Sequence, residues 1–433
     1  MQVYHKGQFH KVGQGLFYSG EFEFGNSKNS KFYYVIDCGS ADISNKYGYS
    51  KIYKHALNLE VELYKKNVLA ENNNIINLFV ISHMHLDHIN GLIDLLKSGV
   101  KINKLFLPYL EPSHNIIIVT EYLFEGSKYN SKDEYIEFVM DPIKFLEQFH
   151  QQIDEIIFIS DSDEEPYRKD DVDNIDESKE SAILIGKRNI KLDREIKGKY
   201  SKVSVYKECS VKINQLFEFY FFKKKIHDIN KIEEFKKAFT HDNIDSDYFK
   251  NYKNRRKLKD NYDKLFGKSR FNDTSLCVWM TYIKNPWEIA TMYRANNKFE
   301  NEKTLLRLSR HSRYKFMRFC DFCESYKIED KFGYVFPGDI DISSDVDFEF
   351  FKSHCATISS KIKIFCVQHH GSEHNWNSKL VNEFYNAIWV FSSGTNNSHG
   401  HPHNKVLNDI SKRRNIIMVD EQQEFIQYTE FEF

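Results

Sequence analysis

The sequence predicts an α/β fold in which two half-sheets, each flanked by helices, enclose a functional site between them. Three observations support this prediction. The apolar, β-branched run 75–81 reads as a buried strand and ends in a histidine cluster. Strand and helix patterns alternate near both ends of the chain. A long charged segment between them, residues 112–270, does not keep that alternation.

The first half of the expected fold is a β-α-β unit. Residues 31–37 form a strand that ends in Asp37, and residues 75–81 form the strand that leads to the histidines. Residues 91–97 then read as a helix and residues 104–108 as the next strand. Parallel strands joined in this way carry their ligands at their carboxyl ends.

The pattern resumes late in the chain. The later expected strands are 275–283, 332–336, 361–367 and 387–391, and the later expected helices are 378–385 and 404–414. The predicted division is a first half of the core at 1–111, a charged and largely helical insertion at 112–270, and a second half of the core at 271–433 with a smaller insertion at about 286–331.

Composition predicts a globular, cytoplasmic protein. The 433 residues are 41% hydrophobic and 15% aromatic, and the formal net charge is −1. No overall field therefore attracts nucleic acid or an anionic membrane, and any such attraction has to be local. Seven scattered cysteines do not suggest a disulfide framework. The sequence shows neither a secretion signal nor an apolar run long enough to span a membrane.

The 112–270 segment holds two charged stretches of opposite sign. Residues 154–180 are strongly acidic and indicate a solvated loop. Residues 223–270 are basic with interspersed aromatic residues. This stretch suits an arm that binds a polyanion, but an amphipathic helical pair with its aromatic side chains packed inward is the favoured alternative.

The histidine cluster carries the strongest chemical signal. His83 and His85 alternate along an extended segment, so both imidazoles can reach one metal ion. Asp87 and His88 then turn toward a neighbouring position. Four candidate ligands within six residues after a buried strand predict a metal site.

Two further features give weaker signals. Cys320 and Cys323 form a lone CxxC pair, for which buried structural cysteines are favoured over a metal site. Several arginines within 307–318 form a second basic cluster, which would line a phosphate channel or form a solvated helix face.

These motifs resemble those of the metallo-β-lactamase superfamily. His83, His85, Asp87 and His88 match its His-x-His-x-Asp-His motif, with Gly91 in the expected place. Val35–Gly39 is similar to the strand that ends in a supporting aspartate. Phe336–Asp339 is similar to the Gly-Asp pair that supplies a carboxylate shared by two metals.

The chain is more similar to the branch that contains the hydrolase domain of the competence protein ComEC and bacterial phosphorylcholine esterases. The matching blocks are Val12–Gly15, Asn272–Val278, His369–Ser372 and Gly400–His403. Two positions depart from the pattern, because Leu16 stands where an acid often follows and His85 where the branch frequently has aspartate. The imidazole of His85 favours zinc over manganese.

The resemblance implies an αββα sandwich with large insertions and a site for two divalent metal ions. The implied metal ligands are His83, His85, Asp87, His88, Asp339, His370 and His401, and the implied catalytic residues are Asp87, His369 and His403. His370 is favoured as the ligand and His369 as the proton donor, although sequence does not separate these neighbours. His374, His399 and His403 stay open as contributors.

The expected function is that of a phosphodiesterase or nuclease that uses a hydroxide shared by the two metals. Its substrate would be a phosphodiester, including nucleic acid. One alternative is a small-ester hydrolase acting on a cyclic nucleotide, a lactone or a phosphorylcholine-like ester. Another is a metal-binding interaction platform in a multi-subunit assembly. The sequence identifies no protein partner.

Overall fold

The structure is a computed structural model of the chain. It describes residues 1–25, 31–41, 50–124, 134–166, 182–197, 202–226, 229–239, 244–245, 247–266, 274–295, 325–329, 331–412 and 415–433. Within these ranges, no helix combines the length and the apolar character needed to cross a membrane.

The strands of the described ranges are β1 (Gln2–Phe9), β2 (Phe17–Phe24), β3 (Lys31–Cys38), β4 (Ile75–Val80), β5 (Lys101–Pro108), β6 (Ile153–Ile159), β7 (Ala182–Arg188), β8 (Val203–Ile213), β9 (Phe217–Lys223), β10 (Leu276–Tyr282), β11 (Glu288–Ala295), β12 (Ser325–Glu329), β13 (Gly333–Phe336), β14 (Ile364–Cys366), β15 (Ile388–Ser392), β16 (Ile416–Val419) and β17 (Phe425–Glu432).

The α-helices are α1 (Ser50–Asn67), α2 (Leu86–Lys97), α3 (Pro112–Phe124), α4 (Glu134–Met140), α5 (Pro142–Leu146), α6 (Ile190–Lys197), α7 (Ile229–Lys237), α8 (Tyr252–Phe266), α10 (Asp345–Cys355), α11 (Leu380–Glu383) and α12 (Asn404–Ser411). A short 3₁₀ turn, η6 (Gln368–Gly371), follows β14.

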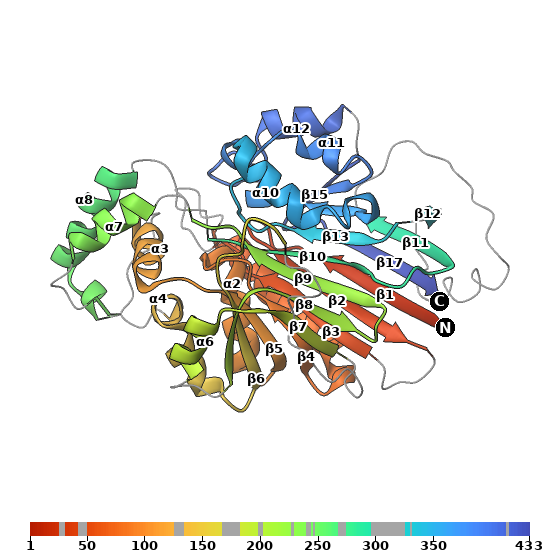
Figure 1. Ribbon diagram of the computed structural model, residues 1–433, viewed down its shortest axis with the longest axis horizontal. Helices are drawn as coiled ribbons and strands as arrows, with labels where there is room; N and C mark the ends of the chain where they lie inside the picture. The colour runs from red at the N-terminus through yellow and green to blue at the C-terminus, as the bar shows by residue number, and fades with distance from the viewer. Residues whose placement is uncertain are drawn as a thin grey trace.

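All of these strands belong to one mixed sheet of 17 strands. Strands β3, β4, β5, β6 and β8 pair in parallel, and so do β13, β14, β15 and β16. The antiparallel strands β9 and β10 join these two parallel blocks, because β9 pairs with both β8 and β10, and β10 pairs with β13. Strand β1 lies between β2 and β17, next to the paired chain ends (Figure 1).

The predicted αββα sandwich is therefore wrong, because the two expected half-sheets are parts of one continuous sheet that curls into a nearly closed barrel. The physical reason is the β8–β9 hairpin, in which β8 pairs with the first parallel block and β9 pairs with β10, which in turn pairs with β13 of the second. Its turn residues Asn214 and Gln215 both have positive φ, 47° and 55°. Two consecutive positive φ values suit a tight hairpin whose twist matches that of its strands.

The inside of the curled sheet is filled largely by aromatic side chains. Phe22 on β2 lies 4.3 Å from Phe217 on β9, measured between ring centroids. Phe106 on β5 stacks on Phe221 at 4.1 Å. These contacts join strands from opposite sides of the barrel, so β9 closes the core as well as the sheet.

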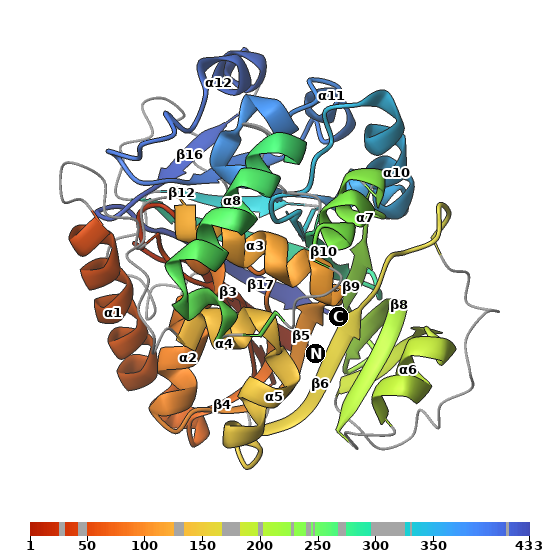
Figure 2. The same ribbon diagram turned by 90° about the vertical axis from the view of Figure 1, so that its left-hand side faces the viewer.

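Helices cover two outer faces of the sheet. Helices α1–α5, with α7 and α8 outside α3, pack over the first parallel block (Figure 2). Helices α10–α12 pack over the second (Figure 1). Each layer buries an apolar face of the sheet, and strands such as β10 and β15, which are covered on both faces, are buried along their whole length.

The 112–270 segment contains helices α3–α8, as expected, but it also contains four unexpected strands, β6–β9. In its basic stretch, Phe235, Phe249 and Tyr262 are buried, whereas Tyr252 is 65% exposed. This arrangement matches the amphipathic pair with inward aromatic residues. Of the acidic stretch, 167–180 lies outside the described residues.

The smaller insertion expected at about 286–331 begins with β11 and ends near β12, which pair with each other. Strand β11 also pairs with β17. The CxxC pair and the 307–318 basic cluster lie outside the described residues.

Candidate metal centre

The candidate ligands lie in loops at the carboxyl ends of the parallel strands. The loop after β4 carries His83, His85 and Asp87, and the third of these is already in the first turn of α2. Asp339 follows β13, and His370 lies in η6 after β14. Parallel strands end on the same side of a sheet, so residues far apart in sequence meet there.

Asp37 at the end of β3 supports the loop that carries the ligands. Its Oδ1 accepts a hydrogen bond from the backbone N–H of Ser82 at 2.6 Å, and its Oδ2 accepts one from the Ser82 hydroxyl at 2.6 Å. His88 Nδ1 lies 2.8 Å from the same Oδ2. Asp37 is fully buried and makes these contacts from a left-handed conformation with φ of 55°.

These contacts determine which imidazole nitrogen carries the proton. His88 donates through Nδ1 to the Asp37 carboxylate, which leaves the Nε2 lone pair of a neutral ring free. The Ser82 hydroxyl already donates to Asp37, so it accepts from His83 Nδ1 at 3.0 Å. Both rings therefore direct an Nε2 lone pair toward the centre, as in metal-binding histidines held by a carboxylate.

The adjacent histidines of η6 are held in the same way. His370 Nδ1 donates to the backbone oxygen of Ser392 at 2.6 Å. His369 Nδ1 lies 2.8 Å from Asn375 Oδ1, while the amide nitrogen of Asn375 donates to the backbone oxygen of Asp339. The amide orientation makes Oδ1 the acceptor, so His369 also has its proton on Nδ1 when neutral.

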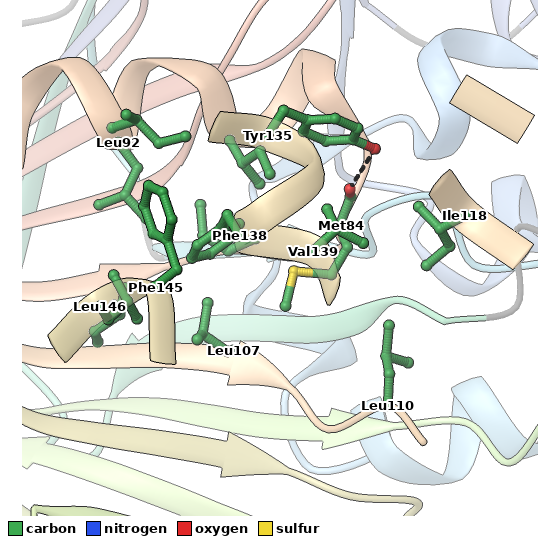
Figure 3. Packing of buried hydrophobic residues seen from close by; sticks show 14 of the residues in the cluster. Met84, Leu92, Leu107, Leu110, Ile118, Tyr135, Phe138, Val139, Phe145 and Leu146 are labelled. Carbon is green, nitrogen blue, oxygen red and sulfur yellow. Dashed lines mark hydrogen bonds between the residues drawn. The ribbon is translucent and has the colours of Figure 1, made fainter. Parts of the chain in front are cut away.

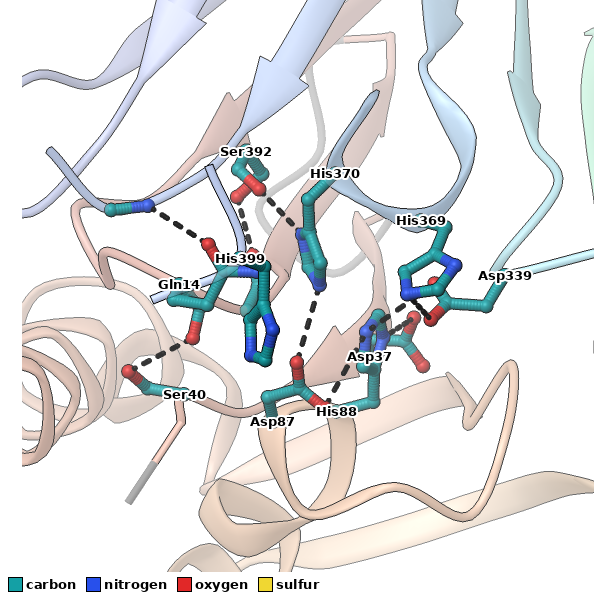
Figure 4. Close-up of polar contacts among 12 residues, drawn as sticks. Gln14, Asp37, Ser40, Asp87, His88, Asp339, His369, His370, Ser392 and His399 are labelled. Carbon is teal, nitrogen blue, oxygen red and sulfur yellow. Dashed lines mark hydrogen bonds and ion pairs between the residues drawn. The ribbon is translucent and has the colours of Figure 1, made fainter. Parts of the chain in front are cut away.

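The Asp339 carboxylate lies close to several imidazoles, of which His369 is next to it in Figure 4. Its Oδ2 is 3.4 Å from His83 Nε2 and 3.7 Å from His369 Nε2. Its Oδ1 is 3.9 Å from His88 Nε2. A second carboxylate is close to the other histidine of η6, because Asp87 Oδ2 is 3.2 Å from His370 Nε2.

Three overlapping triads of ligand atoms each lie within 4.8 Å of one another among the described residues. The triads are His83, His85 and Asp339; His88, Asp339 and His370; and His83, Asp87 and His88. Six of the seven predicted ligands therefore meet. The seventh, His401, is next to this group, with its ring centroid 5.3 Å from that of His369 and 6.4 Å from that of His370.

A cation fits this group because its polar atoms are otherwise unsatisfied. The Nε2 atoms of His83, His85 and His88 are buried and make no hydrogen bond. Buried polar atoms without partners are costly and rare, and coordination to a metal would satisfy these three. Imidazole and carboxylate together form a donor set that suits zinc.

The ionisation of the site reflects burial and close charges. Burial lowers the pKa of His85 to about 3, so this imidazole is neutral. Burial also acts to lower the pKa of His88, but the carboxylates of Asp37 and Asp87 raise it to about 9, so a metal ion would have to displace the Nε2 proton to use that lone pair. Burial would raise the pKa of Asp339, yet His83 and His369 hold it well below its usual range.

His403 differs from the other histidines in its proton position. The backbone N–H of Glu373 donates to His403 Nδ1 at 2.9 Å, so a neutral His403 carries its proton on Nε2. In this arrangement the Nε2–H can donate a hydrogen bond, but a neutral ring does not act as an acid. By contrast, the Asn375 contact of His369 leaves a lone pair on Nε2, which suits a ligand or a proton acceptor. His374 is exposed and belongs to none of the three triads of ligand atoms described above.

Sequence reasoning missed several supporting residues. Ser82 directly precedes the first ligand, and this adjacency was the only local signal for it. Nothing in the sequence marked Asn375 or Ser392. Asn397 was also missed; its side chain binds the backbone N–H and C=O of His401 and so holds that residue in place.

Comparison of the chain with protein-family models gives no match, and a search of curated protein sequences gives none either. The resemblance to the metallo-β-lactamase superfamily and to the ComEC branch therefore stays a prediction from the motifs.

Proposed function

We propose that this protein is a hydrolase of phosphodiesters that depends on two divalent metal ions, with zinc as the favoured metal. The observation that carries the proposal is the position of Asp339. Its two carboxylate oxygens face different imidazoles, His83 and His369 on one side and His88 on the other. A carboxylate shared in this way is the feature expected of a two-metal site.

Two divalent cations at such a centre would lower the pKa of a water molecule toward neutrality and polarise a phosphoester oxygen. The remaining tasks belong to the side chains of the chain. Asp37 and Ser82 orient His83 and His88. The neutral His403 can donate a hydrogen bond from Nε2–H, which would stabilise charge on a leaving-group oxygen without proton transfer.

The test combines metal analysis with activity. Purified protein loaded with zinc or manganese should contain about two equivalents of metal per chain and cleave bis(p-nitrophenyl) phosphate. The double variant His83→Ala/Asp87→Ala should lose both properties. His55→Ala removes an exposed histidine of α1 and should keep both.

Full activity in the double variant would refute the proposal. A protein that takes up no metal and has no activity would point instead to the interaction-platform alternative.

A further inference from the structure

A cavity that is open to solvent lies beside the candidate metal centre. Some of its lining residues belong to the centre, namely His85, Asp87, Asp339, His369, His370 and His401. The others are Gln14 in the β1–β2 loop, Ala41 after β3, Leu86 at the start of α2, His399 in the loop before α12, and Ile118, Glu121, Tyr122 and Tyr135 of helices α3 and α4. The 112–270 segment thus forms part of the cavity lining.

The lining residues of α3 and α4, which are Ile118, Glu121, Tyr122 and Tyr135, form what we call the α3–α4 wall. The Tyr135 hydroxyl donates to the backbone oxygen of Met84 at 3.0 Å, within the loop that carries the ligands (Figure 3). The Tyr122 ring lies 4.4 Å from the Tyr135 ring. The wall is therefore held at a set position next to the ligand loop.

The wall is apolar and aromatic except for one carboxylate. Leu86 and Tyr122 are only partly buried, so they can contact a molecule in the cavity. No lysine or arginine is among the described residues that line it. On the α3–α4 wall, a second phosphate group would therefore meet apolar side chains or the carboxylate of Glu121, and it would find no lysine or arginine among the described lining residues.

The charge of the centre leads to the same conclusion. Two divalent cations would bring four positive charges, of which Asp87 and Asp339 offset two. The remainder suits one phosphodiester monoanion together with its nucleophile. Binding a chain of phosphates would need further cationic contacts, and the described cavity lining holds no lysine or arginine to make them.

The basic residues of α8 have other neighbours. The Lys257 ammonium lies 4.9 Å from the ring centroid of Phe239, and that of Lys259 lies 4.9 Å from the ring of Phe124. Both contacts are cation–π interactions with aromatic residues of the same helical layer. Neither lysine lines the cavity.

We infer that the substrate is a small phosphodiester with a single phosphate and a compact apolar or aromatic organic group, which packs against Tyr122 of the α3–α4 wall and against Leu86 at the start of α2. This inference rests on the proposed function and narrows it, because it excludes a polynucleotide from the cavity. Tyr122 is the residue that determines specificity.

Binding of two phosphonates tests the organic-group contact without requiring turnover. Phenylphosphonate and methylphosphonate present the same anion to the metals and differ only in the group directed at the wall. Calorimetry on the zinc-loaded protein should give a dissociation constant about tenfold lower for phenylphosphonate. Equal affinities would overturn the inference.

Variants of Tyr122 test the assignment of the contact. Tyr122→Ala should remove most of the preference for phenylphosphonate and leave the affinity for methylphosphonate unchanged. Tyr122→Leu keeps an apolar side chain at this position and provides a second variant if the first does not fold. The matched control Tyr252→Ala removes an exposed tyrosine of α8 and should leave both affinities unchanged. A preference that survives both Tyr122 variants would contradict the assignment.

Activity assays separate failure of this inference from failure of the proposed function. The wild-type protein should hydrolyse p-nitrophenyl methyl phosphate, with kcat/KM about tenfold lower in Tyr122→Ala. It should neither cleave a 20-nucleotide single-stranded DNA nor release phenylphosphonate when that DNA is added. Cleavage of the DNA with a steep salt dependence would overturn the inference and leave the hydrolase proposal intact. Absence of metal and of all diester hydrolysis would refute the proposed function itself.

Discussion

At the scale of single residues, the centre depends on side chains that hold ligands without being ligands themselves. Asp37 is the clearest example, because one buried carboxylate accepts from Ser82 twice and from His88 once. Its charge also helps to raise the pKa of His88 to about 9, against the effect of burial. Removing that charge should lower the affinity of the site for metal, although every ligand side chain would still be present.

Asp37→Asn tests this role. The amide has one acceptor oxygen in place of two, so either Ser82 or His88 loses its partner. We expect metal affinity to fall about 10- to 100-fold, as measured by competition with a chelator. Asp345→Asn, which changes a carboxylate that is 75% exposed, is the control and should leave the affinity unchanged. An unaltered affinity in Asp37→Asn would show that the contact is dispensable.

A second residue-scale prediction concerns His5, which is inside the barrel and distant in sequence from the candidate ligands. Burial lowers its pKa from 6.5 to about 3. The unfolded chain therefore binds a proton at this residue below pH 6.5, whereas the folded chain does not until about pH 3. The free energy of unfolding must therefore fall as the pH decreases from 6.5 to about 3. Above pH 6.5, His5 does not contribute to the pH dependence of this free energy.

The comparison is between wild type and His5→Phe, which keeps an aromatic ring beside Phe22. Between pH 6.5 and 5, the wild type should lose about 2 kcal/mol more of its free energy of unfolding than the variant. Urea denaturation at each pH measures this difference. Parallel pH profiles for the two proteins would contradict the prediction.

At the scale of elements, the ligand loop after β4 is held from three directions. Strand β3 supplies Asp37, the β1–β2 loop contacts the backbone of Asp87 through Leu16, and α4 supplies Tyr135. The backbone at Gly39 also packs directly against the start of α2, because a Cβ at this position would lie 2.4 Å from backbone atoms of Asp87 and His88. The loop is therefore shaped by elements that are distant from it in sequence.

Tyr135→Phe removes one of these supports. The backbone oxygen of Met84 would lose its donor in a buried position, which should cost about 1 kcal/mol of unfolding free energy. Tyr252→Phe deletes the hydroxyl of an exposed tyrosine and should change stability by less than about 0.5 kcal/mol. Equal urea midpoints for the two variants would rule out a supporting role for Tyr135.

At the scale of the whole molecule, the continuous sheet predicts cooperative unfolding. All four tryptophans lie beyond residue 270, at positions 279, 287, 376 and 389, so their fluorescence reports on the last third of the chain. Far-ultraviolet circular dichroism reports on all of it. Because β9 and β10 link the two parallel blocks, the two signals should change together in urea. Two separated transitions would show that the blocks unfold independently.

The sequence alone identified the strands that carry the ligands and six residues that the structure brings within ligand distance. Such motifs can be recognised in a sequence because the alternation of apolar residues in a strand and the spacing of ligand residues are local properties of the chain. The αββα prediction was wrong because sheet continuity is not local. The strands β8 and β9 have ordinary strand composition, but they lie in a segment read as an insertion, and their partners are far away in the sequence.

The sequence by itself thus determined the kind of ligand cluster, which consists of imidazole and carboxylate donors at strand ends, and the chemistry that this cluster predicts. Only the tertiary structure decided how the strands join, which nitrogen of each histidine carries its proton, and which side chains line the cavity. Those features depend on contacts between residues hundreds of positions apart, such as Asp87 with His370. Burial and hydrogen-bond geometry decide such contacts, and neither is encoded in a local pattern.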